Sequence, residues 1–345
     1  MDTEESQHMV QFEATLEAAT NGAGESALRY LSTREIRDQA SAQEANGYAA
    51  TYSAEVNSDA FLPLVAAAED TSTIELGTGI AIAFARSPMT LALRAHHLQA
   101  ISGGRFVLGL GSQIKPHITR RYSMPWTKPV AQMESFIEAT RAIWACWREG
   151  GVLDVRNDHY TINLMNSELT PPAISHPDPP VLLAAVGPAM TRLACRAADG
   201  LITHPFAASA SYLREHTVPL VERSLEEAGR ERNAFRLSGA VLVATGATDE
   251  EMANSIRAVR RRIAFYGSTP AYLSVLEHHG WGRLGEQLHS LSRTTDPARW
   301  ERMAELVDDE VVETIGLICR PDEIRQRAAE RYDGLLDRLQ TPVLT

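Results

Sequence analysis

The sequence predicts a (β/α)8 barrel, and three observations support this. Short apolar runs of strand type alternate with longer helical patterns over almost all of the 345 residues. Eight such runs are present, which is the number of strands that closes this kind of barrel. A chain with 44% apolar residues can also bury the large core that a barrel needs. We therefore expect one barrel domain over residues 1–345 rather than an open sheet.

The predicted strands are residues 9–16, 48–54, 73–82, 105–111, 180–185, 199–203, 235–244 and 312–319. Several helical patterns between them begin with Ser or Pro, which are favoured at the first positions of helices. Two stretches interrupt the alternation. Residues 151–164 alternate in period two around Asn157-Asp158, which predicts a hairpin inserted after the fourth helix. Residues 248–310 predict a helical insertion before the last strand.

The segment GGRFVLGLGSQ resembles a dinucleotide-binding turn, but it lacks part of the G-x-G-x-x-G pattern. Gly109 and Gly111 are present, whereas Ile114 takes the third glycine position and Pro116 follows. In a barrel these glycines instead close the strand 105–111. There they give the next loop room to turn and let a ligand approach the backbone.

Charge and composition exclude several kinds of protein. The 33 Lys and Arg against 44 Asp and Glu give a net charge of -11, which offers no general support for nucleic-acid binding. No secretory signal and no apolar run near the roughly 18 residues of a membrane span is present. The three cysteines are isolated, and no metal-binding, P-loop or G-x-S-x-G motif occurs. We expect a cytoplasmic protein without a metal or membrane contact that acts on a small molecule.

In such barrels the loops after the strands carry the active site. The second strand is followed by Glu55 and Asn57, and the fourth by Ser112, Gln113 and the segment KPHITRRY. If residues 117–121 form a helical turn, three basic side chains share one face and can hold an anion: His117, Arg120 and Arg121. The alternative is a solvated basic turn that pairs with nearby acids.

Two further strand ends carry candidates. The fifth strand ends in AAVGP, with Pro188 placed as the first residue of a helix. The N–H groups of such a helix start can bind a phosphate, although an ordinary strand-to-helix turn would look the same. His204 follows the sixth strand, and a lone histidine is more often structural than catalytic.

Five segments together carry a family resemblance: IELGTGIAIAFARSPMTLA, SGGRFVLGLGSQ, KPHITRRYSMPW, VLLAAVGPAM and AADGLITHPF. From about residue 33 to its end, the chain resembles luciferase-like oxidoreductases of the branch that uses the deazaflavin coenzyme F420. The resemblance implies a barrel with an insertion near its C-terminal end, and a homodimer.

The resemblance also implies site residues. It places a non-proline cis peptide at Gly79-Ile80 against the cofactor ring, and a phosphate-binding turn at Val186, Gly187 and Pro188. The candidate cofactor contacts are Gly79, Ile80, Ala81, Ser112, Gln113, Ala185, Val186, Gly187, Pro188 and His204. Three features depart from the family pattern. Glu55, Asn57 and Ser58 stand where relatives often have His or Trp. Gln113 and Ile114 occupy a region where some relatives carry Glu, and the loop 17–32 is unusually long.

The expected reaction is hydride transfer between the deazaflavin and a small organic substrate. His117 and Glu55 are candidates for the proton step, with Asn57 as an orienting residue. Candidates for substrate or anion binding are Lys115, Arg120, Arg121, Tyr122 and Trp126, of which the two aromatic residues could equally be packing. An FMN-dependent monooxygenase remains an alternative, as does an inactive barrel that serves as a binding or partner subunit.

Overall fold

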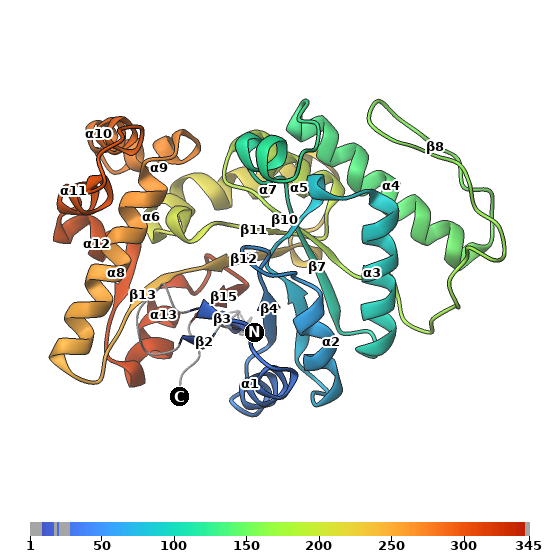
Figure 1. Ribbon diagram of the computed structural model, residues 1–345, viewed down its shortest axis with the longest axis horizontal. Coiled ribbons are helices and arrows are strands. Elements are labelled where there is room, and N and C mark those ends of the chain that lie inside the picture. Colours follow the sequence, from blue (N-terminus) through green and yellow to red (C-terminus); the bar gives the residue numbers. More distant parts are fainter. Residues whose placement is uncertain (1–8, 17–18, 21–27, 342–345) are drawn as a thin grey trace, which may run out of the picture. The chain divides into compact units, whose positions relative to one another are not determined.

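The computed structural model describes residues 9–16, 19–20 and 28–341 (Figure 1). Its main sheet has the strand order β10-β11-β12-β15-β1-β4-β5-β7-β6, and β10 also pairs with β7. Eight strands thus form a closed ring, which confirms the (β/α)8 barrel. They are β1 (Gln11–Thr15), β4 (Ala50–Ser53), β5 (Glu75–Thr78), β7 (Phe106–Gly111), β10 (Val181–Ala184), β11 (Gly200–Ile202), β12 (Arg236–Ala240) and β15 (Arg338–Gln340).

The described chain divides into two compact units. The first unit consists of Glu13–Ala184 and Arg192–Leu201, and the second unit of the remaining described residues. The helix α5 (Pro188–Ala197) therefore contributes residues to both.

In the first unit, parallel strands β4, β5, β7 and β10 lie side by side, with Tyr52 opposite Gly77 and Leu182 opposite Gly109. Helices α1 (Thr33–Ala45) and α2 (Leu62–Glu69) pack together, as do α3 (Pro88–Ile101) and α4 (Pro129–Glu149) (Figure 1). Helix α3 begins with a Ser-Pro pair, as expected for several of the helical patterns, and the Ser87 hydroxyl caps it by accepting from the Thr90 N–H. The largest side chains with almost no solvent exposure in this unit include Phe84, Phe106, Phe136 and Trp144.

The hairpin predicted within residues 151–164 is present after α4. It pairs β8 (Val155–Arg156) with β9 (Thr161–Ile162) in antiparallel register. Asn157 forms the turn, since its side-chain oxygen accepts from the N–H groups of His159 and Tyr160.

The second unit contains the predicted helical insertion, drawn in orange and red in Figure 1. Four helices lie within it: α8 (Asp249–Gly267), α9 (Leu273–His278), α10 (Gly282–Ser292) and α11 (Arg299–Glu305). A fifth helix, α12 (Asp309–Ile315), follows them directly. They share one apolar core that includes Ile263, Leu276, Leu288 and Met303, all fully buried. Three further helical segments precede them along the chain: α6 (Ala210–Tyr212), η5 (Leu213–Thr217) and α7 (Val218–Glu227).

The eighth strand of the barrel is not the predicted one. Within residues 312–319, the first four continue α12, and only β14 (Gly316–Ile318) is extended. β14 pairs with β13 (Leu242–Ala244) in a separate two-stranded parallel sheet. The ring is completed by β15, which follows α13 (Ile324–Tyr332). β15 was missed because its three residues, RLQ, hold one apolar side chain, Leu339, and leave no apolar run to detect.

No helix among the described residues has the length and apolar character needed to span a membrane.

Candidate functional site

In the first unit, the segment after β5 contains the peptide that the sequence singles out. The bond between Gly79 and Ile80 is cis, as the resemblance implies. The short strand β6 (Ala81–Ile82) follows and pairs with the end of β7. A Cβ atom added to Gly111 would lie 2.7 Å from Cδ1 of Ile80. Gly111 therefore makes room for the Ile80 side chain, a contact that the sequence did not indicate.

Glu55, in the loop after β4, holds this segment from several directions. Its backbone N–H donates to the Ile80 carbonyl at 3.2 Å, and its Oε2 accepts from the Ile82 N–H at 2.7 Å. Arg86 donates to both carboxylate oxygens of Glu55, at 2.6 and 2.7 Å, and to the Ile82 carbonyl at 3.2 Å. The Glu55 and Arg86 side chains are only 8% and 11% exposed.

These contacts engage both oxygens of the Glu55 carboxylate. A carboxylate that accepts a two-point guanidinium contact and a backbone N–H is held in one orientation. The geometry therefore gives Glu55 a structural task, to hold residues 80–82, in place of the proton step considered from the sequence. Arg86 was not among the sequence candidates. The signal for it is the family segment IAFARSP, in which it is the only basic residue.

Residues 117–121, after β7, do form a helical turn, and it takes the wider π form over His117–Arg121 (η3). Arg121 donates to the Val56 carbonyl at 2.6 Å, and its guanidinium lies 5.1 Å from the centre of the Tyr122 ring. The loop after β4 is thus tied to the turn after β7. His117 and Arg120 are exposed on that turn.

Three basic side chains of this turn are candidates for binding an anion: Lys115, Arg120 and Arg121. Within the described residues, no ion pair is formed by Lys115, Arg120 or Arg121, which favours anion binding over a basic turn paired with nearby acids. Their positive charge is available to a ligand.

The remaining candidates of the first unit differ in how they are placed. Gln113 has a positive φ of 58°, and its side-chain oxygen accepts from the Ile114 N–H at 3.0 Å. Ser112 donates to the Gln113 carbonyl. Asn57 is exposed, and its backbone carbonyl accepts from the Tyr30 hydroxyl at 3.4 Å. Trp126 packs edge-on against Phe84, with ring centres 5.8 Å apart, which favours a packing role for Trp126.

In the second unit, Ala185, Val186 and Gly187 lead into α5, which begins at Pro188 as predicted. Gly187 is exposed, and a Cβ atom there would meet no atom within 4 Å. Its carbonyl accepts from the N–H and the hydroxyl of Thr191, at 3.1 and 3.2 Å. The start of the helix therefore faces open space, which fits a bound phosphate group.

His204, after β11, also lies in the second unit and is fixed in one tautomer. Its Nδ1 accepts from the Phe206 N–H at 3.2 Å, so a neutral ring carries its proton on Nε2. The rings of Tyr266 and Tyr272 lie 4.5 and 4.8 Å from the His204 ring. Burial lowers the pKa of His204 to about 4. At neutral pH the side chain is therefore an uncharged donor at Nε2. The two tyrosines, distant in sequence, were not candidates.

A family model described as luciferase-like monooxygenase matches residues 10–338 of the chain. The chain belongs to this family. At this level of description it is an oxidoreductase.

The chain is also similar in sequence or in fold to known proteins. The chain is 47% identical over 302 residues to the uncharacterized protein Rv1360 of Mycobacterium tuberculosis, covering 88% of each. It is 28% identical over 280 residues to the 5,10-methylenetetrahydromethanopterin reductase of Archaeoglobus fulgidus, covering 79% of this chain and 78% of that protein. Its fold resembles the solved coenzyme F420-dependent tetrahydromethanopterin reductase of Methanopyrus kandleri. That likeness has a TM-score of 0.75 and 20% identity, and covers 97% of this chain and 93% of the other.

Proposed function

We propose that the chain is an F420-dependent oxidoreductase that transfers a hydride between the deazaflavin and a small organic substrate. The similarity to the Archaeoglobus fulgidus reductase supports reductase chemistry. The observation that carries the choice of cofactor is the turn after β7, where Lys115 and Arg120 have no acidic partner within the described chain.

The charge on this turn suits the acidic tail of F420, which is longer than the single phosphate of FMN. The net charge of -11 would repel such a tail at a distance. Charges farther away than about 8 Å are largely screened at physiological salt, so the nearby lysine and arginine decide the interaction.

When bound, the deazaflavin supplies or accepts the hydride. The residues of the chain bind, orient and move a proton. In this proposal the N–H groups at the start of α5 bind a phosphate beside Gly187, and His204 donates a hydrogen bond from Nε2. Glu55 and Arg86 hold the Ile80 segment in place. His117 handles the proton, Asn57 orients the substrate, and Tyr122 lines the substrate side.

An FMN-dependent monooxygenase on the same barrel is the second candidate, because the matching family model is described as luciferase-like monooxygenase. The third candidate is a catalytically inactive barrel that acts as a binding or partner subunit. The departure from the family at Glu55 and Asn57 favours it. We further propose a homodimer, which light scattering of the purified protein tests directly.

Cofactor titration separates the three candidates. Visible absorbance and protein fluorescence are followed as F420 or FMN is added to the purified chain, and oxygen uptake is measured with reduced FMN. The proposal predicts saturable F420 binding with a Kd below tens of micromolar, and no FMN-dependent oxygen uptake. Tight FMN binding without F420 binding would favour the monooxygenase, and no binding of either would favour the inactive barrel.

A further inference from the structure

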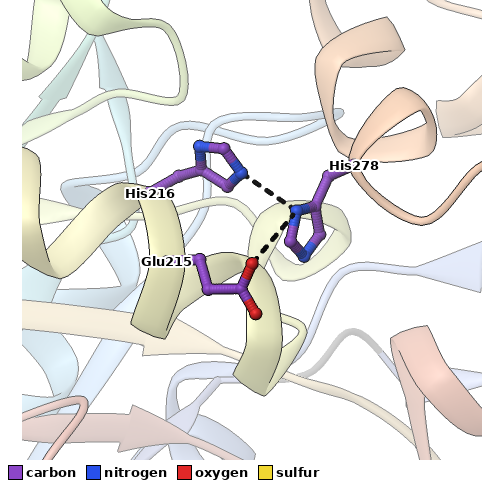
Figure 2. A group of neighbouring side chains, drawn as sticks. All are labelled: Glu215, His216 and His278. Atoms are coloured by element: carbon purple, nitrogen blue, oxygen red, sulfur yellow. Dashed lines mark hydrogen bonds and ion pairs between the residues drawn. The ribbon is translucent and has the colours of Figure 1, made fainter.

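Three side chains able to bind a metal meet in the helical part of the second unit (Figure 2). Glu215 and His216 lie on η5, and His278 is the last residue of α9. One oxygen of Glu215 and one ring nitrogen of each histidine all lie within 4.8 Å of one another. No sequence motif indicates this cluster, because His216 and His278 are 62 positions apart in the chain.

The distances between these atoms are close to those of a metal site. Nε2 of His216 lies 2.9 Å from Nδ1 of His278, and a carboxylate oxygen of Glu215 lies 3.9 Å from the same Nδ1. In a tetrahedral zinc site with metal–ligand bonds of about 2.0–2.1 Å, neighbouring ligand atoms are roughly 3.3–3.4 Å apart. Shifts of about half an ångström would bring these two separations to that value. The third separation, between the Glu215 oxygen and the His216 nitrogen, is at most 4.8 Å, so the exposed Glu215 side chain would have to move by up to about 1.5 Å.

His278 is already oriented for this role. Its Nε2 lies 3.2 Å from the Ser211 hydroxyl, which leaves Nδ1 directed at Glu215 and His216. Hydrogen bonding at the outer ring nitrogen is the usual way in which a metal-binding histidine is held. The side chain is only 11% exposed, and the Tyr212 ring lies edge-on against it at 5.5 Å. One ligand is therefore fixed, while the 62% exposed side chain of Glu215 can adjust.

Two arrangements explain why the ring nitrogens of His216 and His278 face each other. At 2.9 Å, one imidazole donates a proton to the lone pair of the other. Alternatively, both neutral rings direct a lone pair at one cation, with Glu215 supplying negative charge. Two imidazoles and one carboxylate form a ligand set that suits zinc, whereas magnesium and calcium prefer oxygen ligands alone.

We propose that Glu215, His216 and His278 bind one divalent transition-metal ion, for which Zn²⁺ is the best match, with water as the fourth ligand. The ion would join η5 to α9. The segment before α9 is η7 (Pro270–Tyr272), which carries the tyrosine that packs against His204. The ion would thus stabilise the helices that support this candidate cofactor residue.

Zinc binding to the untagged full-length chain, freed of metal with a chelator, tests the proposal. Zn²⁺ is titrated in competition with a chromogenic chelator. Thermal unfolding is followed with and without zinc, since a ligand that binds only the folded state raises Tm.

We expect one equivalent of zinc to bind the wild-type chain with a Kd in the micromolar range or tighter. His216→Gln should weaken binding at least ten-fold, and Glu215→Gln should weaken it less. Both residues are exposed, so both variants should keep the fold, which circular dichroism checks.

The matched control is His97→Gln, which removes an exposed histidine of α3 outside the cluster. This variant should bind zinc and gain thermal stability as the wild type does. The proposal is overturned if the wild type shows no saturable binding, if zinc leaves its Tm unchanged, or if His216→Gln binds as tightly as the control. Equal weakening by His216→Gln and His97→Gln would also overturn it, because zinc would then be binding surface histidines at large.

Discussion

The Ile80 side chain occupies the space that a side chain on Gly111 would need. An added Cβ atom would lie 2.7 Å from Cδ1 and 2.9 Å from Cγ1 of Ile80, both well inside normal contact distance. The end of β7 and the segment around Ile80 therefore pack closely together. A substitution at Gly111 is expected to move Ile80.

Gly111→Ala should push Ile80 out of position. Because the atoms in conflict are at the end of a side chain that is not fully buried, we expect a loss of about 1 kcal/mol in the free energy of unfolding. F420 affinity should fall at least ten-fold if Ile80 contacts the ring. Denaturant unfolding and cofactor titration measure the two effects. Gly151→Ala is the control, since its Cβ atom would meet nothing within 4 Å. Unchanged F420 affinity in Gly111→Ala would remove Ile80 from the proposed ring site.

Glu55→Gln should destabilise the protein, because it leaves the guanidinium of Arg86 buried without its counter-charge. We expect a loss of roughly 3 kcal/mol in the free energy of unfolding, measured in urea. Asp38→Asn is the control, because it breaks an ion pair on the surface. The Arg34 and Asp38 side chains are 91% and 71% exposed, and such exposed pairs contribute little to the free energy of unfolding. A stable Glu55→Gln variant with normal F420 binding but no turnover would instead restore Glu55 as the residue of the proton step.

His204 should make the protein less stable as the pH falls from about 6.5 to about 4. In that window the unfolded chain binds a proton at this position and the folded chain does not, so protonation favours unfolding. The difference amounts to at most about 3.4 kcal/mol. Unfolding free energies of the wild type and of His204→Gln, measured between pH 4 and pH 7.5, isolate this contribution from those of other groups. Parallel curves for the two proteins would contradict the buried neutral state of His204.

Arg120→Gln should weaken F420 binding by about three- to ten-fold and reduce its dependence on salt, because one cation facing the acidic tail is lost. FMN binding, if present, should change less. Titrations at low and moderate ionic strength give both quantities. Arg223→Gln on α7 is the control, since it removes the same charge from an exposed helix face. If both variants bind F420 with equal affinity, the turn after β7 does not hold the tail.

The sequence predicted the barrel and the positions of most of its strands, because buried strands and amphipathic helices leave clear periodic patterns. It also located the Gly79-Ile80 bond and the start of α5 at Pro188, since both lie in short segments with a recognisable order of residues. β15 could not be found in the same way, because pairing with its neighbours, rather than an apolar run of its own, makes RLQ a strand.

Partnerships between distant residues were beyond the reach of the sequence. Glu55 and Arg86 are 31 positions apart, and His204 meets tyrosines more than 60 positions further along. Neither the residue pattern nor the composition indicates that the Glu55 carboxylate pairs with an arginine. They also give no sign that burial among aromatic rings keeps His204 neutral.

The sequence alone thus determined the architecture of the chain and the loops in which its chemistry is to be sought, because local periodicity and short motifs encode both. The tertiary structure decided the task of each side chain. Burial, charge pairing and the direction of a lone pair depend on neighbours that only folding brings within a few ångströms.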